Sequence, residues 1–142
     1  LFLLFKDRQL LKSVDYALLG TFVAFFVFIG NLSAISWFQD LLVSALEGRV
    51  TAIAVAASQV ISNVPAALLL SGFTQEWGAL LIGCNIGGLG TLIASMASLI
   101  SYKQVAREYP EKKRKYFIWF TVSNLVLLAL LLLEYGLLEW LF

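Results

Sequence analysis

Ser58-Gln59-Val60-Ile61-Ser62-Asn63-Val64-Pro65-Ala66-Ala67 interrupts an apolar, uncharged run that extends from Val50 to Ser71. Proline removes a backbone donor and clashes with the preceding helical turn, and in lipid every freed backbone group must find another partner. A second interruption, Asn85-Ile86-Gly87-Gly88-Leu89-Gly90-Thr91, lies inside the next apolar run. Paired breaks of this kind indicate a transporter site built from the ends of broken helices, against the plainer alternative of two kinked membrane helices.

The composition is that of an integral membrane protein. The chain is 61% hydrophobic, with a mean hydropathy of +0.88, whereas soluble domains are about 45–50% apolar. A helix needs about 20 residues to cross a hydrocarbon core of about 30 Å. Three uncharged segments approach or exceed that length: Tyr16–Phe38, Trp77–Tyr102 and Tyr116–Leu133, the last of which continues in apolar character to Phe142. We therefore expect an all-α integral membrane helix bundle.

Basic residues predict the orientation of these segments. Nine of the ten Lys and Arg residues lie at positions 6–12 and 103–115, and only Arg49 lies elsewhere. The positive-inside rule places both basic stretches in the cytoplasm. The first span then runs outward and the second returns, so residues 50–75 can make no net crossing. We therefore expect a re-entrant hairpin that enters from the outer side of the plasma membrane, within a multi-pass protein.

The two arms of this hairpin have suitable lengths. Val50–Ile61 gives about twelve residues and Pro65–Phe73 about nine, which is too short to cross at about 1.5 Å per residue. Ser62 and Asn63 are favourable N-cap residues at the turn between the arms. The proline falls in the first turn of the second arm, where its missing donor costs nothing.

The second break predicts a discontinuous helix. We expect a half-helix over Trp77–Cys84, an unwound stretch over Asn85–Gly90, and a second half-helix over Thr91–Tyr102 whose first residue is the N-cap. Glycines in the unwound stretch allow unusual backbone angles and the close approach of a ligand. The Gly83-x-x-x-Gly87 spacing also suits tight helix packing. We assign four small residues after the break to packing: Ala94, Ser95, Ala97 and Ser98.

The start of the chain predicts a preceding segment. Leu1–Phe5 is apolar, lacks an initiator Met and is followed by charges from Lys6 onward. A signal peptide would carry its positive charges before the apolar region rather than after it. We divide the chain into 1–5 as the end of a preceding helix, 16–38 as transmembrane, 39–49 as an outer interfacial helix, 50–75 as the re-entrant hairpin, 77–102 as the broken transmembrane helix, 103–115 as a cytoplasmic basic loop and 116–138 as transmembrane.

The motifs around both breaks resemble those of the ion transporter superfamily. This group includes divalent anion–sodium symporters, citrate transporters, arsenite permeases and a branch of sodium–proton antiporters. The resemblance covers nearly the whole chain and implies the C-terminal one of two inverted repeats, with a site completed by the N-terminal half of the protein. The similar stretches are Ser62-Asn63-Val64-Pro65-Ala66-Ala67, Gly83-x-Asn85-x-Gly87-Gly88-x-Gly90-Thr91 and Ala94-Ser95-x-Ala97-Ser98-Leu99-Ile100.

The resemblance also implies the residues of a site. In the family's symporters the hairpin tip and the unwound segment jointly hold substrate carboxylates and sodium, and Ser58 matches a hydroxyl that coordinates sodium. Val64 stands where the symporters have Thr and cannot hydrogen-bond a carboxylate, which leaves arsenite-type, citrate-type and other anions open. The substrate-binding residues expected from the two breaks and the match are Ser62, Asn63, Val64, Pro65, Asn85, Gly87, Gly88, Gly90 and Thr91.

Helix dipoles provide a mechanism that does not depend on the resemblance. The apolar segments contain no charged residue, so selectivity must come from backbone dipoles. The helix N-termini after each break would carry about half a positive charge and favour an anion. Terminal carbonyls near Ile61 and Cys84, with oxygens of Ser58 and Asn63, could coordinate a hard cation such as sodium. An anion together with a cation, either sodium or a proton, fits symport.

Other classes of function fit less well. A channel with a re-entrant pore loop would need a carbonyl-rich filter repeat, whereas a sodium–proton antiporter of the same superfamily stays open as an alternative. An enzyme is not expected, because the chain has no His and one Cys and its apolar segments offer no nucleophile with a base. No cofactor beyond a coupling sodium ion is expected. The expected partners are a small anion, a coupling cation, the lipid bilayer, the N-terminal half and a second copy of the chain, and residues 112–115 serve orientation rather than nucleic-acid binding.

Overall fold

The computed structural model describes residues 16–141, and every regular element within that range is a helix. The all-α expectation is therefore confirmed for those residues, whereas the predictions for residues 1–5 and for the basic positions 6–12 lie outside them. In chain order the elements are α3 (Tyr16–Leu32), α4 (Ser36–Leu46), α5 (Val50–Ile61), α6 (Asn63–Ser71), α7 (Trp77–Gly87), α8 (Met96–Glu108), the 3-10 helix η1 (Pro110–Lys112) and α9 (Lys113–Leu141).

Among the described helices, the stretch Pro110–Leu141 is long and apolar enough to cross a membrane by itself. Leu19–Leu32 and Ser36–Leu46 reach a similar length only as a pair, with a bend of 94° between them. α3 therefore ends before Phe38, and the helix predicted for residues 39–49 begins earlier, as α4. Polar groups mark the bend, because Gln39 Nε2 donates to the Ser33 carbonyl at 2.6 Å.

The predicted basic loop 103–115 is mostly helical, because α8 continues to Glu108 and α9 starts at Lys113. Lys, Arg, Gln and Glu are all good helix formers, so a charged stretch need not be a loop. At its far end α9 also includes two carboxylates, Glu134 and Glu139. The last helix therefore continues beyond its uncharged part.

The core lies between α5, α6 and α7, where small residues let two helices approach closely. A Cβ atom placed on Gly83 would lie 2.6 Å from the Thr51 carbonyl oxygen, and one on Gly87 would lie 2.8 Å from Ser58 Cβ. The tight-packing interpretation of the Gly83-x-x-x-Gly87 spacing is therefore confirmed. The buried residues of this core are Leu46, Val50, Ala54, Ala66, Leu70, Leu80 and Cys84.

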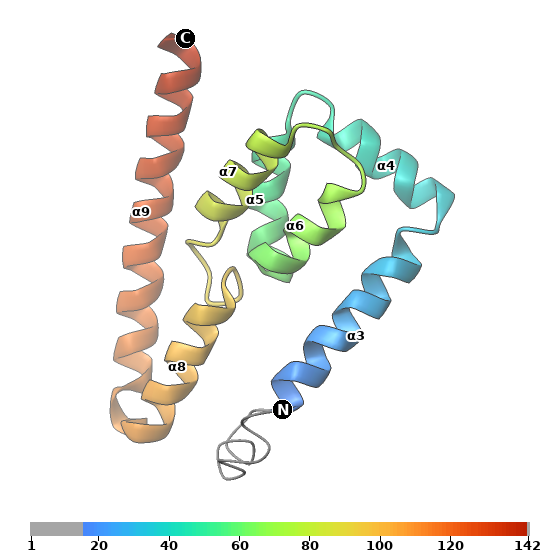
Figure 1. The fold of residues 1–142 in the computed structure, drawn as a ribbon. Coiled ribbons are helices and arrows are strands. Elements are labelled where there is room, and N and C mark those ends of the chain that lie inside the picture. The colour runs from blue at the N-terminus through green and yellow to red at the C-terminus, as the bar shows by residue number, and fades with distance from the viewer. Residues whose placement is uncertain (1–15, 142) are drawn as a thin grey trace, which may run out of the picture.

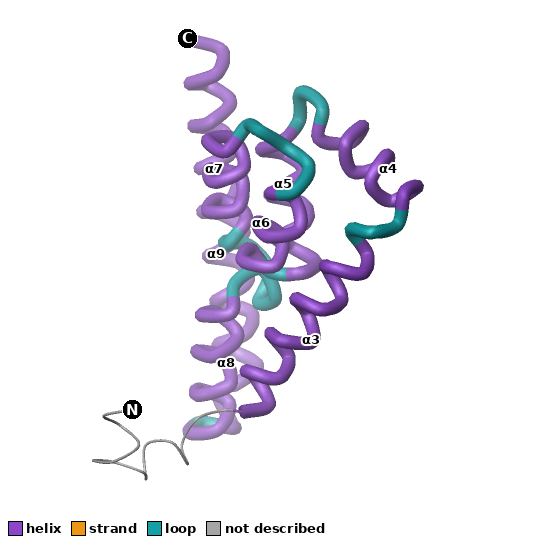
Figure 2. Tube along the Cα trace, turned by 45° about the vertical axis from the view of Figure 1, so that its right-hand side comes forward, coloured by secondary structure: helices purple, strands orange, loops and turns teal. Residues whose placement is uncertain are grey.

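Both breaks lie near the middle of the molecule (Figure 1). α5 runs inward from the loop after α4, and α6 returns to the same end, where α7 begins. α8 continues from α7 toward the opposite end, and α9 runs back to the end where α5 begins. The turned view places the loop between α7 and α8 at the level of the turn between α5 and α6 (Figure 2).

Candidate functional site

Ser62 forms the one-residue turn between α5 and α6 and occupies the N-cap position of α6. Its φ of 74° and ψ of 152° lie in a region where a residue with a side chain is strained by about 1–3 kcal/mol. No other non-glycine residue in the described part of the chain has a positive φ. The side chain is 4% exposed, and its Oγ has no hydrogen-bond partner there. A strained turn whose buried hydroxyl lacks a partner indicates a functional position.

The backbone donors at the start of α6 are already used. Asn63 N donates to the Ala94 carbonyl at 2.9 Å, and Val64 N donates to Asn63 Oδ1 at 2.9 Å. The next residue is a proline, which has no N–H, and Ala66 N donates to the Ser62 carbonyl at 3.0 Å. The helix dipole still favours an anion here, but an anion reaches the Val64 amide only after the Asn63 side chain turns away.

α7 extends further than predicted. It continues to Gly87 instead of ending at Cys84, so Asn85 is helical and exposed. Asn85 Nδ2 donates to the Leu81 carbonyl one turn back, at 2.8 Å. The expectation that Asn85 belongs to the unwound stretch is therefore wrong, because close packing of α7 on α5 keeps this part of the chain helical.

The unwound stretch covers residues 88–95, and α8 begins at Met96. Ser95, not Thr91, occupies the N-cap position of α8, and its side chain makes no capping bond. The prediction of Thr91 as N-cap is therefore wrong. Its hydroxyl is engaged elsewhere, because it donates to the Gln59 carbonyl at 3.2 Å.

Gln59 lies in the first interruption but is not among the predicted site residues, and its side chain contacts the second break. Its Nε2 donates to the Gly87 and Leu89 carbonyls, each at 2.8 Å, and its Oε1 accepts from the Thr91 amide at 3.0 Å. A Cβ atom on Gly90, whose φ is +104°, would lie 2.5 Å from Gln59 Oε1, so glycine is required. The available signal is a glutamine within an otherwise apolar helix arm, where an unpaired amide is costly.

The structure brings the hairpin tip and the unwound stretch together. A Cβ atom on Gly88 would lie 3.0 Å from Asn63 Nδ2, so the Asn63 amide lies against the start of the break. Of the nine predicted substrate residues, the structure gathers Ser62, Asn63, Gly88, Gly90 and Thr91 at this junction, exposes Val64 beside it, packs Pro65 and Gly87 into buried positions and leaves Asn85 outside.

Three of the four predicted cation ligands lie along α5 and its contact with α7, whereas Asn63 is the first residue of α6 and its Oδ1 accepts from the Val64 amide. Ser58 is fully buried, and its Oγ donates to the Ala54 carbonyl at 2.7 Å. Cys84 is buried in the core, and Ile61 is the last residue of α5. Within residues 16–141, no group of three or more His, Cys, Asp or Glu could hold a metal ion. A cation at this place would be bound by hydroxyl and carbonyl oxygens.

A cavity of about 120 Å³ opens beside the tip. Ser62 lines it together with Thr21 and Phe25 of α3 and with Met96, the first residue of α8. The N-terminus of α8 carries partial positive charge and has no side-chain cap. Most of the residues that line the cavity are apolar, and Ser62 and Thr21 are its two hydroxyl residues.

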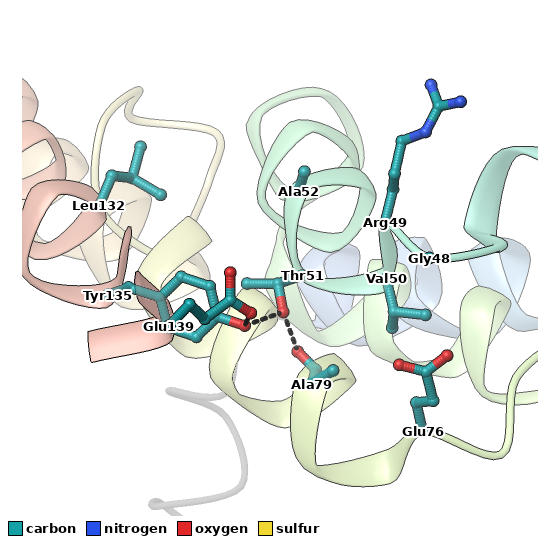
Figure 3. Close-up of a pocket in the computed structure, with 10 residues that line it drawn as sticks. All are labelled: Gly48, Arg49, Val50, Thr51, Ala52, Glu76, Ala79, Leu132, Tyr135 and Glu139. Atoms are coloured by element: carbon teal, nitrogen blue, oxygen red, sulfur yellow. Dashed lines mark hydrogen bonds between the residues drawn. The ribbon is translucent and has the colours of Figure 1, made fainter. Parts of the chain in front are cut away.

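A second cavity, of about 260 Å³, lies where α5, α7 and α9 meet (Figure 3). Thr51 Oγ1 donates to the Ala79 carbonyl at 3.3 Å and lies 3.0 Å from Tyr135 Oη. Tyr135 donates in turn to Glu139. These contacts attach α9 to the α5–α7 pair, and the sequence patterns do not reveal them.

Two known proteins are similar to the chain. Over 91 residues it is 42% identical to a protein of Methanocaldococcus jannaschii named as an uncharacterized transporter, a match that covers 64% of this chain and 26% of that protein. Over 99 residues it is 37% identical to the inner membrane protein YbiR of Escherichia coli, a match that covers 68% and 27%. The chain thus matches about a quarter of the length of each relative. No family model and no solved structure matches it.

The similarity agrees with the apolar, all-helical fold. One relative is named as a transporter and the other as an inner membrane protein. Together with the fold, the two names support a helical membrane protein. The two names state neither a substrate nor a coupling ion.

Proposed function

We propose that this chain is one repeat of a secondary active transporter for a small anion, coupled to sodium or to protons. The substrate would bind where the hairpin tip meets the unwound stretch. The observation that carries the proposal is Ser62, a strained residue whose buried hydroxyl has no partner among the described residues. Strain and unpaired buried polar atoms cost stability, so they persist mainly where function requires them.

The helix arrangement supports the proposal. The start of α5 and the end of α6 lie at the same end of the molecule (Figure 1), as a re-entrant hairpin requires. α7 and α8 continue in one general direction across their break, as the two halves of a broken spanning helix would. Hairpin and broken-helix ends that meet at mid-depth are a recurrent design of transporter sites.

The chemistry of the junction suits a pair of oppositely charged ions. Ser62 Oγ and Asn63 Nδ2 can donate to an anion, and the uncapped start of α8 adds partial positive charge. Oxygens of Ser58 and Asn63, with carbonyls at the end of α5, can face a cation. Because opposite charges attract strongly at short distance in a dry site, each bound ion would raise the affinity for the other, which is the basis of coupled transport.

Counterflow exchange tests the transport mode directly. The full-length protein would be reconstituted in proteoliposomes and offered labelled arsenite, citrate or a dicarboxylate, with and without sodium or a pH gradient. A transporter exchanges solute one for one, whereas a channel does not. If the wild-type protein exchanged no anion under any gradient, the proposed function would be wrong.

Ser62→Ala tests the site. It removes the hydroxyl but keeps a side chain at the strained turn, and we expect about tenfold or greater loss of affinity, because a hydrogen bond to a charged group is worth about 1.5–3 kcal/mol. Ser71→Ala is the matched control, since the Ser71 hydroxyl donates only to the Leu68 carbonyl at the far end of α6. Unchanged exchange by Ser62→Ala would remove this residue from the site.

A further inference from the structure

The Gln59 side chain stands between two groups that would bond each other in a continuous helix. In an α-helix the amide of residue 91 would donate to the carbonyl of residue 87. In the structure, Gln59 Nε2 donates to the Gly87 carbonyl at 2.8 Å, and Gln59 Oε1 accepts from the Thr91 amide at 3.0 Å. The carboxamide therefore replaces one helix hydrogen bond by two bonds of its own.

The second amide hydrogen of Gln59 also binds the unwound stretch. Gln59 Nε2 has a second acceptor, the Leu89 carbonyl at 2.8 Å, so both amide hydrogens bind the backbone of the break. Gly90 passes so close that a Cβ atom there would lie 2.5 Å from Gln59 Oε1. A single side chain from α5 therefore hydrogen-bonds the backbone at both ends of residues 87–91 and contacts Gly90 between them.

The two breaks also exchange backbone partners. In a continuous α5, the Asn63 amide would donate to the Gln59 carbonyl. Instead, the Gln59 carbonyl accepts from the Thr91 hydroxyl at 3.2 Å, and the Asn63 amide donates to the Ala94 carbonyl at 2.9 Å. Each broken helix therefore supplies partners that the other has lost, as the interior of a membrane requires.

We propose that Gln59 is a positioning residue of the transport site, which holds residues 88–95 open against the hairpin tip before any ligand binds. The inference rests on the proposed function for its role in transport, although the clamp itself is a property of the fold. A site held open in advance does not pay the cost of ordering a glycine-rich segment when the ligand binds. Loss of the clamp should therefore weaken binding of the anion more than it slows the maximal rate.

Hydrogen exchange tests the clamp without any substrate. Gln59→Met in the full-length protein keeps the approximate length of the side chain and removes its three hydrogen bonds. We expect amides within residues 88–95, that of Thr91 above all, to exchange about tenfold faster than in the wild type. Thr51→Val is the matched control, because it also removes a polar contact from α5 to α7, at the far end of the helix. It should leave exchange in the break unchanged.

A second variant separates hydrogen bonding from packing. Gln59→Glu keeps an acceptor for the Thr91 amide but donates no bond when ionised and at most one when protonated. It therefore loses at least one of the two bonds to the Gly87 and Leu89 carbonyls, so exchange should also accelerate. It serves as the test if the methionine variant does not fold. Unchanged or slower exchange of residues 88–95 in the folded variant would overturn the proposal.

The transport measurement supplies the functional half of the test. We expect Gln59→Met to raise the half-saturating anion concentration about tenfold or more, and Thr51→Val to leave it unchanged. If Gln59→Met accelerated hydrogen exchange in residues 88–95 but left the half-saturating anion concentration unaltered, the positioning role would be wrong. A wild-type protein that exchanges no anion would instead defeat the proposed function, and the hydrogen-exchange result would still decide the clamp.

Discussion

The Ala94 carbonyl accepts a 2.9 Å hydrogen bond from the backbone amide of Asn63, which joins the hairpin tip to the end of the unwound stretch. Ala94 is fully buried at this contact. The tip and the break are therefore parts of one unit, and a change at either should be felt by the other. The assignment to packing holds for Ala94, whose backbone also supplies a partner to the tip, but not for Ala97, which is exposed in the structure.

Ala94→Leu should destabilise this junction. Ala94 is fully buried, so a larger side chain must displace its neighbours, and overpacking costs about 1–3 kcal/mol. Ala97→Leu is the control, because Ala97 is exposed in the first turn of α8. Thermal unfolding of the two purified variants measures the difference. Equal midpoints would mean that the junction is looser than this contact indicates.

Gly83→Ala should separate α5 from α7. Its Cβ would lie 2.6 Å from the Thr51 carbonyl oxygen, which is backbone and cannot turn aside, so we expect a cost of about 1–3 kcal/mol. Gly78→Ala, on the same helix, meets nothing within 4 Å and should be neutral or stabilising by about 0.5–1 kcal/mol. Unfolding midpoints that move in the same direction by the same amount would contradict the close helix contact.

Cysteine labelling should report the orientation of the hairpin. Gln75, Asp40 and Glu111 are all exposed, and Cys84 would first be replaced by alanine. An impermeant thiol reagent should reach Gln75→Cys and Asp40→Cys from outside the cell, and Glu111→Cys only from the cytoplasm. Labelling of positions 75 and 111 from the same side would require α5 and α6 to span, and the re-entrant hairpin would be wrong.

Local signals in the sequence predict the hairpin well and the second break poorly. α5 begins and ends at the predicted Val50 and Ile61, and the turn lies at the predicted Ser62, because the Ser-Asn-x-Pro pattern acts within a few residues. The second arm covers Asn63–Ser71 instead of Pro65–Phe73, and Ser62 occupies its N-cap position without a side-chain cap bond. The position of the second break depends on Gln59, a residue distant in the chain. No local pattern can show that contact, and the unwound stretch therefore lies at 88–95 instead of 85–90.

Val64→Thr should widen substrate choice. Val64 is 48% exposed beside the tip, so a hydroxyl there can reach a ligand without entering the core. We expect partial dicarboxylate binding, limited to the roughly 1.5–3 kcal/mol of one hydrogen bond to a charged group. Val43→Thr adds the same hydroxyl to an exposed position on α4 and should have no effect. A gain in neither variant would show that the missing hydroxyl does not set specificity.

Asn63 offers the sharpest test of an anion at the tip. Asn63→Asp keeps an oxygen that can accept from the Val64 amide, and a carboxylate in the first turn of a helix is stabilising, so the hairpin should remain folded. Its negative charge would repel an anion, and we expect anion exchange to be lost while the unfolding midpoint is maintained or raised. Asn63→Ala should also lose exchange, but with a cost of about 1 kcal/mol for the lost hydrogen bond from the Val64 amide to Asn63 Oδ1. Anion exchange at the wild-type rate by the folded aspartate variant would mean that the substrate does not approach this tip, because a fixed charge of the same sign at the binding position cannot be without effect.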